Sequence, residues 1–383
     1  MAQVEPFHGT RYSPDLVPDL GRVVSPPYDV IPEERLEDYR SRSPYNVVRL
    51  VRPGADYAGA ARLERSWLES GVLREDRQRA FYLHQHIFEG RVRRGLIGAV
   101  GLSPYGEGKV LPHERTHGGA KADRLELYRA TATAFEPLWF VYRGAGGDLP
   151  GLLDEGFATE PEVTFATDDG AGHRVWPVTD ADWQKRVTRA FAELPLLIAD
   201  GHHRYETALT YAAEVGAAGE SAAGFAMVLL VDIDDPGLIV LPTHRVMRIA
   251  PVAVVGGDPV GSLAEALAGI RGRVAAGHYA AGHFQVLPLE GESALVELHR
   301  QVIDNLLGKR SAEDVLVYTR DAEEAVRWVD EGRGKQAFFL EPPDLAVVLK
   351  LAQEGRVLPQ KSTFFHPKPP SGMVFARLDR PEP

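Results

Sequence analysis

The sequence predicts a mixed α/β protein with more than one domain. Its 383 residues exceed one ordinary domain, and a size of about 150 residues per domain gives two or three. Hydrophobic residues make up 44% of the chain and charged residues 25%, which is typical of a globular protein and not of a disordered or fibrous one. Short apolar runs that suit strands alternate with amphipathic segments that suit helices along most of the chain.

The spacing of apolar residues gives the expected elements in order. Amphipathic spacing predicts helices at 32–40, 58–70 and 180–191, with Asp180 as the N-cap of the third. Apolar or alternating runs predict strands at 47–51, 80–88, 95–102, 137–142, 173–178, 196–198 and 225–233. The runs 80–88 and 95–102 flank Glu89-Gly90-Arg91, so we expect a β-hairpin there. Residues 110–127 are dense in charge and are interpreted as a polar loop.

The sequence also suggests how the chain is divided. From about residue 250 the predicted helices are rich in Ala, Gly and Val, which indicates a separate α/β lobe. We expect an N-terminal α/β part that carries substrate-side loops, a phosphate-binding core, an inserted α/β lobe and a C-terminal return segment that completes the site. Their boundaries are 1–145, 146–249, 250–345 and 346–383.

The composition excludes several kinds of protein. A net charge of −11 argues against a duplex-DNA binder, which needs a basic surface. The chain has no cysteine, which excludes disulfides, zinc–thiolate sites, iron–sulfur clusters and cysteine nucleophiles. No secretory signal and no apolar run of about 18 residues is found. We expect a cytoplasmic protein that acts on a small molecule and binds neither nucleic acid nor membrane, with homodimer formation left open.

The most informative segment is Asp200-Gly201-His202-His203-Arg204, which joins a buried strand to a helix. Backbone N–H groups at the start of a helix, with a cation one turn further on, form an anion site. Two histidines and an arginine can bind phosphate through charge-assisted hydrogen bonds, and Asp200 can organise a metal. The alternative is a capped helix whose histidines only satisfy surface groups.

A charged segment nearer the N-terminus offers a catalytic base. A carboxylate near a phosphate site can take a proton from a hydroxyl, and Glu114 is our candidate. Lys121 and Arg124 are candidates for phosphate contacts, and Asp123 is a candidate for holding Mg²⁺ or orienting Arg124. The alternatives are that Glu114 forms a structural salt bridge with Arg115 or Arg124, and that the segment is simply solvated.

Three further polar groups lie beside apolar or proline-rich segments. They are Lys361, Ser362 and Thr363 in the tail, His244 and Arg245 after an apolar strand, and Ser25, Tyr28 and Asp29 in a stiff loop. We expect a return strand to bring the tail group, together with Lys368, to the phosphate. We expect the other two groups to bind the substrate, although His244 and Arg245 equally suit a capping role. Because these motifs are rich in His, Arg and Lys, we expect a positive pocket in an acidic protein.

Five segments resemble one prokaryotic family, the domain of unknown function number 1015. They are Ser25-Pro-Pro-Tyr-Asp-Val30, Asn46-Val-Val-Arg-Leu50, Pro112-His-Glu-Arg-Thr116 with Asp123-Arg124-Leu125, Ile198-Ala-Asp-Gly-His-His-Arg-Tyr-Glu-Thr-Ala-Leu209, and Leu358-Pro-Gln-Lys-Ser-Thr-Phe-Phe-His-Pro-Lys368. They span nearly the whole chain in the expected order. This resemblance implies membership and names no reaction.

A second resemblance does imply a reaction. Asp200-Gly201-His202-His203-Arg204 is similar to the nucleotide-phosphate motif of ParB/sulfiredoxin-like proteins, including kinases of free serine. It implies a ParB/sulfiredoxin-like core that binds ATP or ADP with Mg²⁺ and phosphorylates a serine-like hydroxyl, with His202 and His203 catalytic and Glu114 as the base. Glu114 lies further from the motif than in those kinases, and the absence of Cys excludes sulfiredoxin chemistry. A phosphatase that uses the same anion pocket and a non-enzymatic nucleotide-binding regulator are the alternatives.

Overall fold

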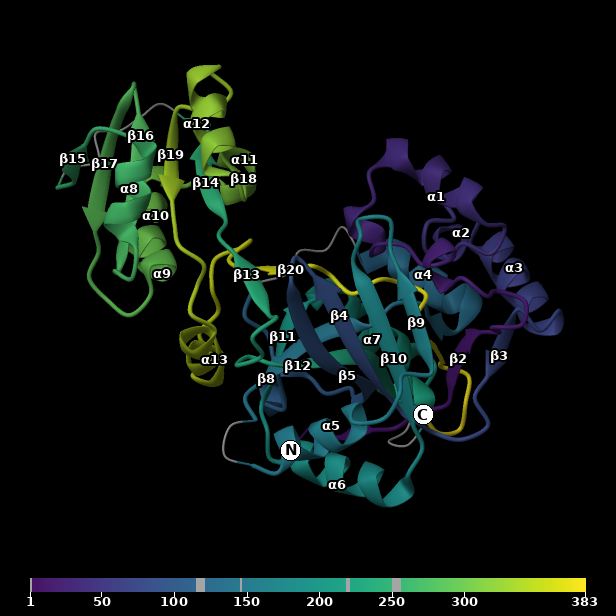
Figure 1. Cartoon of the computed structure of the whole chain (residues 1–383). Coiled ribbons are helices and arrows are strands. Elements are labelled where there is room, and N and C mark those ends of the chain that lie inside the picture. The colour runs from purple at the N-terminus through teal and green to yellow at the C-terminus, as the bar shows by residue number, and fades with distance from the viewer. Residues whose placement is uncertain (1, 115–120, 145–146, 218–220, 250–255) are drawn as a thin grey trace. The chain divides into compact units, whose positions relative to one another are not determined.

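The computed structural model describes residues 2–114, 121–144, 147–217, 221–249 and 256–383. Contacts divide the chain into two compact units, which are treated separately (Figure 1). The first comprises Met1–Pro112, Thr116–Leu238 and Pro367–Pro383, and the second comprises His113–Arg115 and Ile239–His366. The predicted lobe at 250–345 falls within the second unit, which also includes residues 239–249 and 346–366. In the described ranges no helix is long and apolar enough to cross a membrane.

A nine-stranded mixed sheet forms the centre of the first unit. Its strand order is β6-β11-β8-β12-β5-β4-β10-β9, with β1 paired to β5. The strands are β1 Val4–Glu5, β4 Phe81–Phe88, β5 Arg91–Gly101, β6 Val110–Leu111, β8 Leu138–Tyr142, β9 Val163–Ala166, β10 Gly172–Val178, β11 Leu196–Asp200 and β12 Phe225–Asp232. The β6–β11 and β8–β12 pairs are parallel and the other pairs are antiparallel. The predicted hairpin is confirmed, because β4 and β5 pair around Glu89-Gly90.

Two helices, α5 Leu149–Phe157 and α6 Ala181–Ala192, pack on this sheet (Figure 1). The buried side of α6 carries Trp183, Val187 and Phe191, which recur at helical spacing and meet the aromatic core of the sheet. The predicted cap is confirmed, since the Asp180 side chain accepts a hydrogen bond of 2.6 Å from the Trp183 N–H. The two helices thus cover one side of the sheet. The residues of the candidate site come from other elements.

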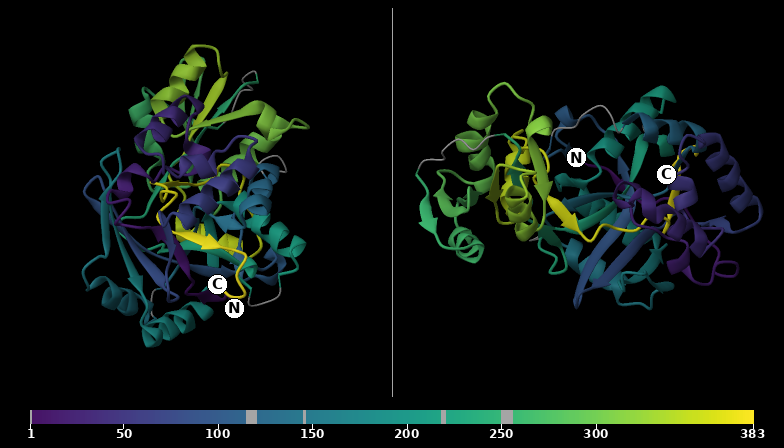
Figure 2. Two further views of the ribbon diagram at one scale, coloured as in Figure 1. Left: turned by 90° about the vertical axis from the view of Figure 1, so that its right-hand side faces the viewer. Right: turned by 90° about the horizontal axis from the view of Figure 1, so that it is seen from above.

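A smaller sheet joins the two ends of the first unit. Its order is β3-β2-β21-β7, with β2 Gly9–Tyr12, β3 Leu73–Glu75, β7 Thr133–Ala134 and β21 Phe375–Arg377. Strand β2 (purple) near the start of the chain pairs antiparallel with β21 (yellow) near its end (Figure 2). The C-terminal segment is therefore held inside the first unit, where it can contribute side chains to a site.

Five helices complete the first unit, and two predictions about them need correction. They are α1 Leu36–Arg42, α2 Val48–Val51, α3 Tyr57–Glu69, α4 Lys121–Thr131 and α7 His202–Glu214. The strand predicted at 47–51 is wrong: Asn46 accepts a hydrogen bond of 3.0 Å from the Val48 N–H and so starts a helical turn. Residues 121–127 are helical and do not form a loop. The prediction missed this helix because charged residues surround the buried Leu127 and obscure the helical spacing.

The second unit contains a six-stranded antiparallel sheet and a two-stranded ribbon. The sheet order is β15-β17-β16-β19-β14-β18, and the ribbon pairs β13 Ile239–Leu241 with β20 Phe364–His366. The sheet strands are β14 His244–Met247, β15 Asp258–Val260, β16 Ala275–Ala280, β17 His283–Pro288, β18 Leu316–Thr319 and β19 Gln336–Phe339. The helices are α8 Leu263–Ile270, α9 Ala294–Leu298, α10 Asp304–Leu307, α11 Ala312–Val315, α12 Ala322–Asp330 and α13 Leu345–Gln353. The mixed α/β class predicted from the sequence is confirmed.

Candidate functional site

The candidate site begins at the junction of β11 and α7. Strand β11 ends at Asp200, and α7 starts at His202 directly after Gly201, whose φ is +98°. A Cβ at Gly201 would lie 2.8 Å from Cδ2 of Leu138, so both backbone conformation and space require glycine here. Helix starts of this kind bind anions through their backbone N–H groups, and α7 begins with the half-buried His202 and His203. The strand–glycine–helix junction predicted from the sequence is confirmed.

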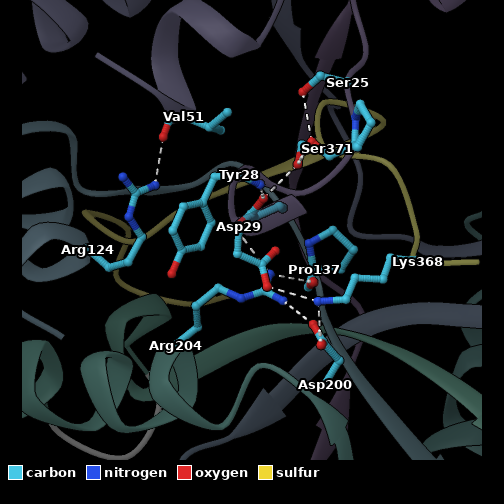
Figure 3. A network of polar contacts seen from close by, with 12 residues as sticks. Ser25, Tyr28, Asp29, Val51, Arg124, Pro137, Asp200, Arg204, Lys368 and Ser371 are labelled. Atoms are coloured by element: carbon cyan, nitrogen blue, oxygen red, sulfur yellow. Dashed lines mark hydrogen bonds and ion pairs between the residues drawn. The ribbon is translucent and has the colours of Figure 1, made fainter. Parts of the chain in front are cut away.

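Asp200 is held between two cationic side chains (Figure 3). Its Oδ2 lies 2.7 Å from Nη2 of Arg204, and its Oδ1 lies 2.7 Å from Nζ of Lys368. Lys368 also lies 2.9 Å from Oδ2 of Asp29, in the predicted substrate loop. Burial alone would raise the pKa of Asp200, but Lys368 and Arg204 lower this pKa to about 2. Asp200 is therefore a carboxylate at neutral pH.

Arg204 extends the same network to a carboxylate that was not predicted from the sequence. Its Nη1 lies 3.2 Å from Oε1 of Glu136 and donates to the Pro137 carbonyl at 3.1 Å. Oε2 of Glu136 accepts hydrogen bonds from the Ser371 hydroxyl at 2.6 Å and from the Tyr28 N–H at 3.3 Å. The available signal was a lone acidic residue directly before the apolar run 137–142, where a charge must find a partner if it is buried.

The predicted residues Tyr28 and Arg124 meet beside this network. The Arg124 guanidinium lies 4.1 Å from the centre of the Tyr28 ring and donates to the Val51 carbonyl at 2.8 Å. Arg124 also donates to Asp123, which accepts a hydrogen bond of 2.7 Å from the Tyr57 hydroxyl. Burial raises the pKa of Tyr28 in spite of the nearby arginines, so its phenol stays protonated. Ser25 joins the same region through its backbone bridge with Ser371 (Figure 3).

A small cavity separates Arg124 from Arg204. Its volume is about 20 Å³, enough for one water molecule. The lining residues are Val51, Arg124, Leu127, Tyr128, Phe135, Glu136 and Arg204. Two buried guanidinium groups and a carboxylate therefore line a void whose other walls are Val51, Leu127, Tyr128 and Phe135.

Carboxylates outnumber cations in the described network. The cations are Arg124, Arg204 and Lys368, and the carboxylates are Asp29, Asp123, Glu136 and Asp200. The positive pocket expected from the sequence is not found among these residues, because each cation is already paired with an acidic side chain. The side chain of Lys121, another predicted phosphate ligand, lies outside the described residues.

The remaining predicted residues lie in the second unit. Oε1 of Glu114 accepts a hydrogen bond of 2.8 Å from the Ser362 N–H, and Thr363 is bonded through its Oγ1 to Nε2 of His113 at 2.7 Å. Lys361 is exposed, and its carbonyl accepts a hydrogen bond of 3.4 Å from Arg245. The sequence predicts that these residues join Asp200 in one composite site, and that convergence stays a prediction.

His244 and Arg245 are buried in the second unit. Burial lowers the pKa of His244 to about 4, helped by the charge of Arg245, and its Nδ1 accepts a hydrogen bond of 3.3 Å from the Leu340 N–H. Burial also lowers the pKa of Arg245 to about 10. Their proposed role in substrate binding stays a prediction, and in this structure both side chains are engaged inside the unit.

No group of three or more His, Asp or Glu side chains that suits a metal ion occurs among the described residues. The oxygens of Asp200 contact Arg204 and Lys368, and those of Asp123 contact Tyr57 and Arg124. These carboxylates do not form a ready-made Mg²⁺ site, and their role in binding Mg²⁺ stays a prediction. Mg²⁺ commonly binds through substrate phosphates and waters with only one or two carboxylates.

Three histidines cluster on the main sheet, away from the predicted metal ligands. His84 and His86 of β4 are 1% and 2% exposed, and His173 of β10 is 1% exposed. Nε2 of His84 and Nδ1 of His173 share a hydrogen bond of 3.0 Å, and His86 bonds to the buried Arg93 at 2.9 Å. Sheet pairing with β10 explains the burial, which the sequence of one strand does not reveal.

Residues 4–254 match a family model described as protein of unknown function (DUF1015), and this range is more than half of the chain. The chain belongs to the DUF1015 family. No curated protein matches the DUF1015 chain.

Three solved structures are similar to the DUF1015 chain at low identity. A free serine kinase in complex with AMP has a TM-score of 0.38 and 18% identity, covering 67% of this chain and 83% of that one. A conserved hypothetical protein from Pyrococcus furiosus has a TM-score of 0.38 and 18% identity, with coverages of 71% and 93%. A mutant free serine kinase in complex with ADP has a TM-score of 0.38 and 16% identity, with coverages of 72% and 88%. These TM-scores are too low to establish a shared fold.

Proposed function

We propose that the DUF1015 chain is a nucleotide-dependent kinase that phosphorylates the hydroxyl of a small, serine-like metabolite. The observation that carries the proposal is the convergence of Arg204 and Lys368 on Asp200 at the start of α7. Helix N-termini that follow a glycine turn bind phosphate through backbone N–H groups and the helix dipole. The resemblance of Asp200-Gly201-His202-His203-Arg204 to a nucleotide-phosphate motif supports the same conclusion and is the reason for choosing a serine-like acceptor.

The charge of the site favours a nucleotide that arrives with its cation. Carboxylates outnumber cations in the network, so a bare polyphosphate would be repelled unless positive charge came with it. A nucleotide bound with Mg²⁺ would supply both that charge and the phosphoryl group. The N–H groups of α7, with His202 and His203, would hold its phosphates, while Arg204 and Lys368 fix the β11–α7 junction through Asp200.

Glu114 is the proposed general base. It would take the proton from the acceptor hydroxyl as the oxygen attacks phosphorus, a role that contributes about 10²–10⁴-fold to a rate. Its carboxylate already accepts the Ser362 N–H, and hydrogen bonds of this kind favour the ionised form that a base needs.

Two measurements test the proposal. A thermal-shift screen with ATP, ADP and AMP, with and without Mg²⁺, should raise the melting temperature for at least one nucleotide, because binding to the native state stabilises it. With that nucleotide and serine-like acceptors, Glu114→Gln should lower kcat about 100-fold or more, whereas Glu107→Gln, at an exposed ion pair with Lys109, should not.

The outcomes separate the three candidate functions. A phosphorylated acceptor supports the kinase, whereas phosphate release to water without an acceptor supports a phosphatase. Nucleotide binding without turnover supports a regulator. The absence of stabilisation by every nucleotide contradicts the proposal.

A further inference from the structure

We infer that the backbone of Lys361, Ser362 and Thr363 forms a nest that positions the carboxylate of Glu114, and that the ammonium of Lys361 does not bind phosphate. A nest is a concavity of successive backbone N–H groups that binds an anion. The inference rests on the proposed function, in which Glu114 is the base. It makes this tail segment a positioning element for Glu114, in place of the phosphate ligand that the sequence predicts.

The backbone of Lys361 is the first observation. Its φ is +54°, a left-handed conformation that non-glycine residues rarely adopt unless the surrounding structure holds them there. The side chain is exposed and forms no ion pair with any described residue. A strained backbone under an exposed, unpaired side chain indicates that the conformation of the chain matters at this position more than the ammonium group does.

The conformation of Lys361 directs the next two N–H groups toward one carboxylate oxygen. The Ser362 N–H donates to Oε1 of Glu114 at 2.8 Å, and the Thr363 N–H lies 3.5 Å from the same atom. Ser362 is buried, so a carboxylate held there is shielded from solvent on that side. The nest therefore fixes one oxygen of Glu114 and stabilises its negative charge.

A second set of contacts holds the residue next to Glu114. Nε2 of the fully buried His113 is bonded to Oγ1 of Thr363 at 2.7 Å, and the His113 carbonyl accepts the Leu358 N–H at 2.7 Å. Glu114 also forms a parallel backbone bridge with Leu358. The segment 358–363 thus holds His113 and Glu114 through both side-chain and backbone contacts.

Arg245 stabilises both the nest and the charge in it. Its Nη2 donates to the carbonyl of Lys361 at 3.4 Å, which restrains the residue with the unusual φ. The guanidinium is 1% exposed and forms no ion pair with a carboxylate in the described ranges. Burial lowers its pKa, whereas the nearby Tyr318 and Glu114 act to raise that pKa, so Arg245 and Glu114 favour each other's charged forms.

Substitutions of Lys361 test the role of its backbone conformation separately from the role of its side chain. Glycine removes the ammonium and accepts a positive φ, whereas valine removes the ammonium and disfavours that φ. We expect Lys361→Gly to retain a kcat about ten-fold higher than Lys361→Val, with the same nucleotide KM in both variants. If instead Lys361→Gly loses as much kcat as Lys361→Val and also raises the nucleotide KM, the side chain binds phosphate and the inference is wrong.

A pH profile distinguishes positioning of the base from a general loss of structure. When N–H donors leave the carboxylate, Glu114 is protonated more easily, so the acid limb of kcat/KM should move to higher pH in Lys361→Val. Thr363→Val removes the hydroxyl bonded to His113 and should also lower kcat, while Thr363→Ser keeps that hydroxyl and should restore it. An unchanged profile with unchanged kcat in Lys361→Val and Thr363→Val overturns the inference.

Two controls keep this inference separate from the proposed function. A wild-type chain that transfers no phosphoryl group, or a fully active Glu114→Gln, contradicts the proposed function itself. A wild-type chain that is active and needs Glu114, but tolerates both valine variants, contradicts only the positioning role. Each variant is assayed at least about 10 °C below its own melting temperature, so that unfolding does not lower the measured rates.

Discussion

The Nζ atom of Lys368 lies 2.7 Å from Oδ1 of Asp200 and 2.9 Å from Oδ2 of Asp29. One cation from the C-terminal segment therefore bridges the strand that leads into α7 and the proline-rich loop of the N-terminal region. The preceding residue is anchored too, because Nη1 of the buried Arg93 donates to the Pro367 carbonyl at 2.6 Å. The C-terminal segment is thus part of the candidate site, and loss of its contacts should disturb the site.

We expect Lys368→Met to destabilise the protein, since it leaves Asp200 and Asp29 without their shared cation. The Lys368 side chain is only 12% exposed, and breaking a largely buried ion pair costs about 3–5 kcal/mol. Urea unfolding measures this loss, and nucleotide-induced stabilisation should fall with it. The control is Lys350→Met, whose exposed pair with Glu292 contributes at most about 1 kcal/mol. Equal losses in the two variants would show that the Lys368 bridge contributes nothing special.

Gly201→Ala should destabilise the β11–α7 junction through two effects. The alanine must adopt a φ of +98°, and its Cβ would approach Leu138 to 2.8 Å. Gly216→Ala is the control, because Gly216 has a φ of +64° and open space around its Cβ position. We expect the control to lose about 1 kcal/mol from backbone strain alone, and Gly201→Ala to lose more in urea unfolding. A smaller loss in Gly201→Ala than in the control would contradict the steric argument.

The sequence could predict the local part of the site. Asp200, Gly201 and His202 stand at a strand–turn–helix junction, and both the apolar strand and the glycine are visible in the residue pattern. The loop around Tyr28 was also expected at the site, since paired prolines stiffen it. These features depend on neighbouring residues, so no knowledge of the tertiary fold is needed to see them.

The parts that the sequence could not predict depend on long-range packing. Glu136 becomes a site residue only because the fold brings Arg204 and Ser371 to it. Lys361 gave no sign of a positive φ, because lysine has no preference for that conformation. The helical turn at 48–51 resembles a short strand, since periodicity does not distinguish a short, mostly apolar run in a strand from one in a buried helix.

The histidine cluster predicts a loss of stability at mildly acidic pH. Burial, together with the charge of Arg93, lowers the pKa of His84 well below its usual range and that of His173 to about 4. Between about pH 6.5 and pH 4 the unfolded chain therefore binds protons that the native histidines do not, so stability is full above this window and falls as the pH drops through it. From about pH 7 to pH 5 we expect each of the two histidines to remove about 2 kcal/mol from the free energy of unfolding. His173→Gln should lessen the fall measured by urea unfolding at the two pH values, while His283→Gln, at an exposed position, should leave it unchanged. A fall of the same size in wild type and His173→Gln would mean that other groups cause it.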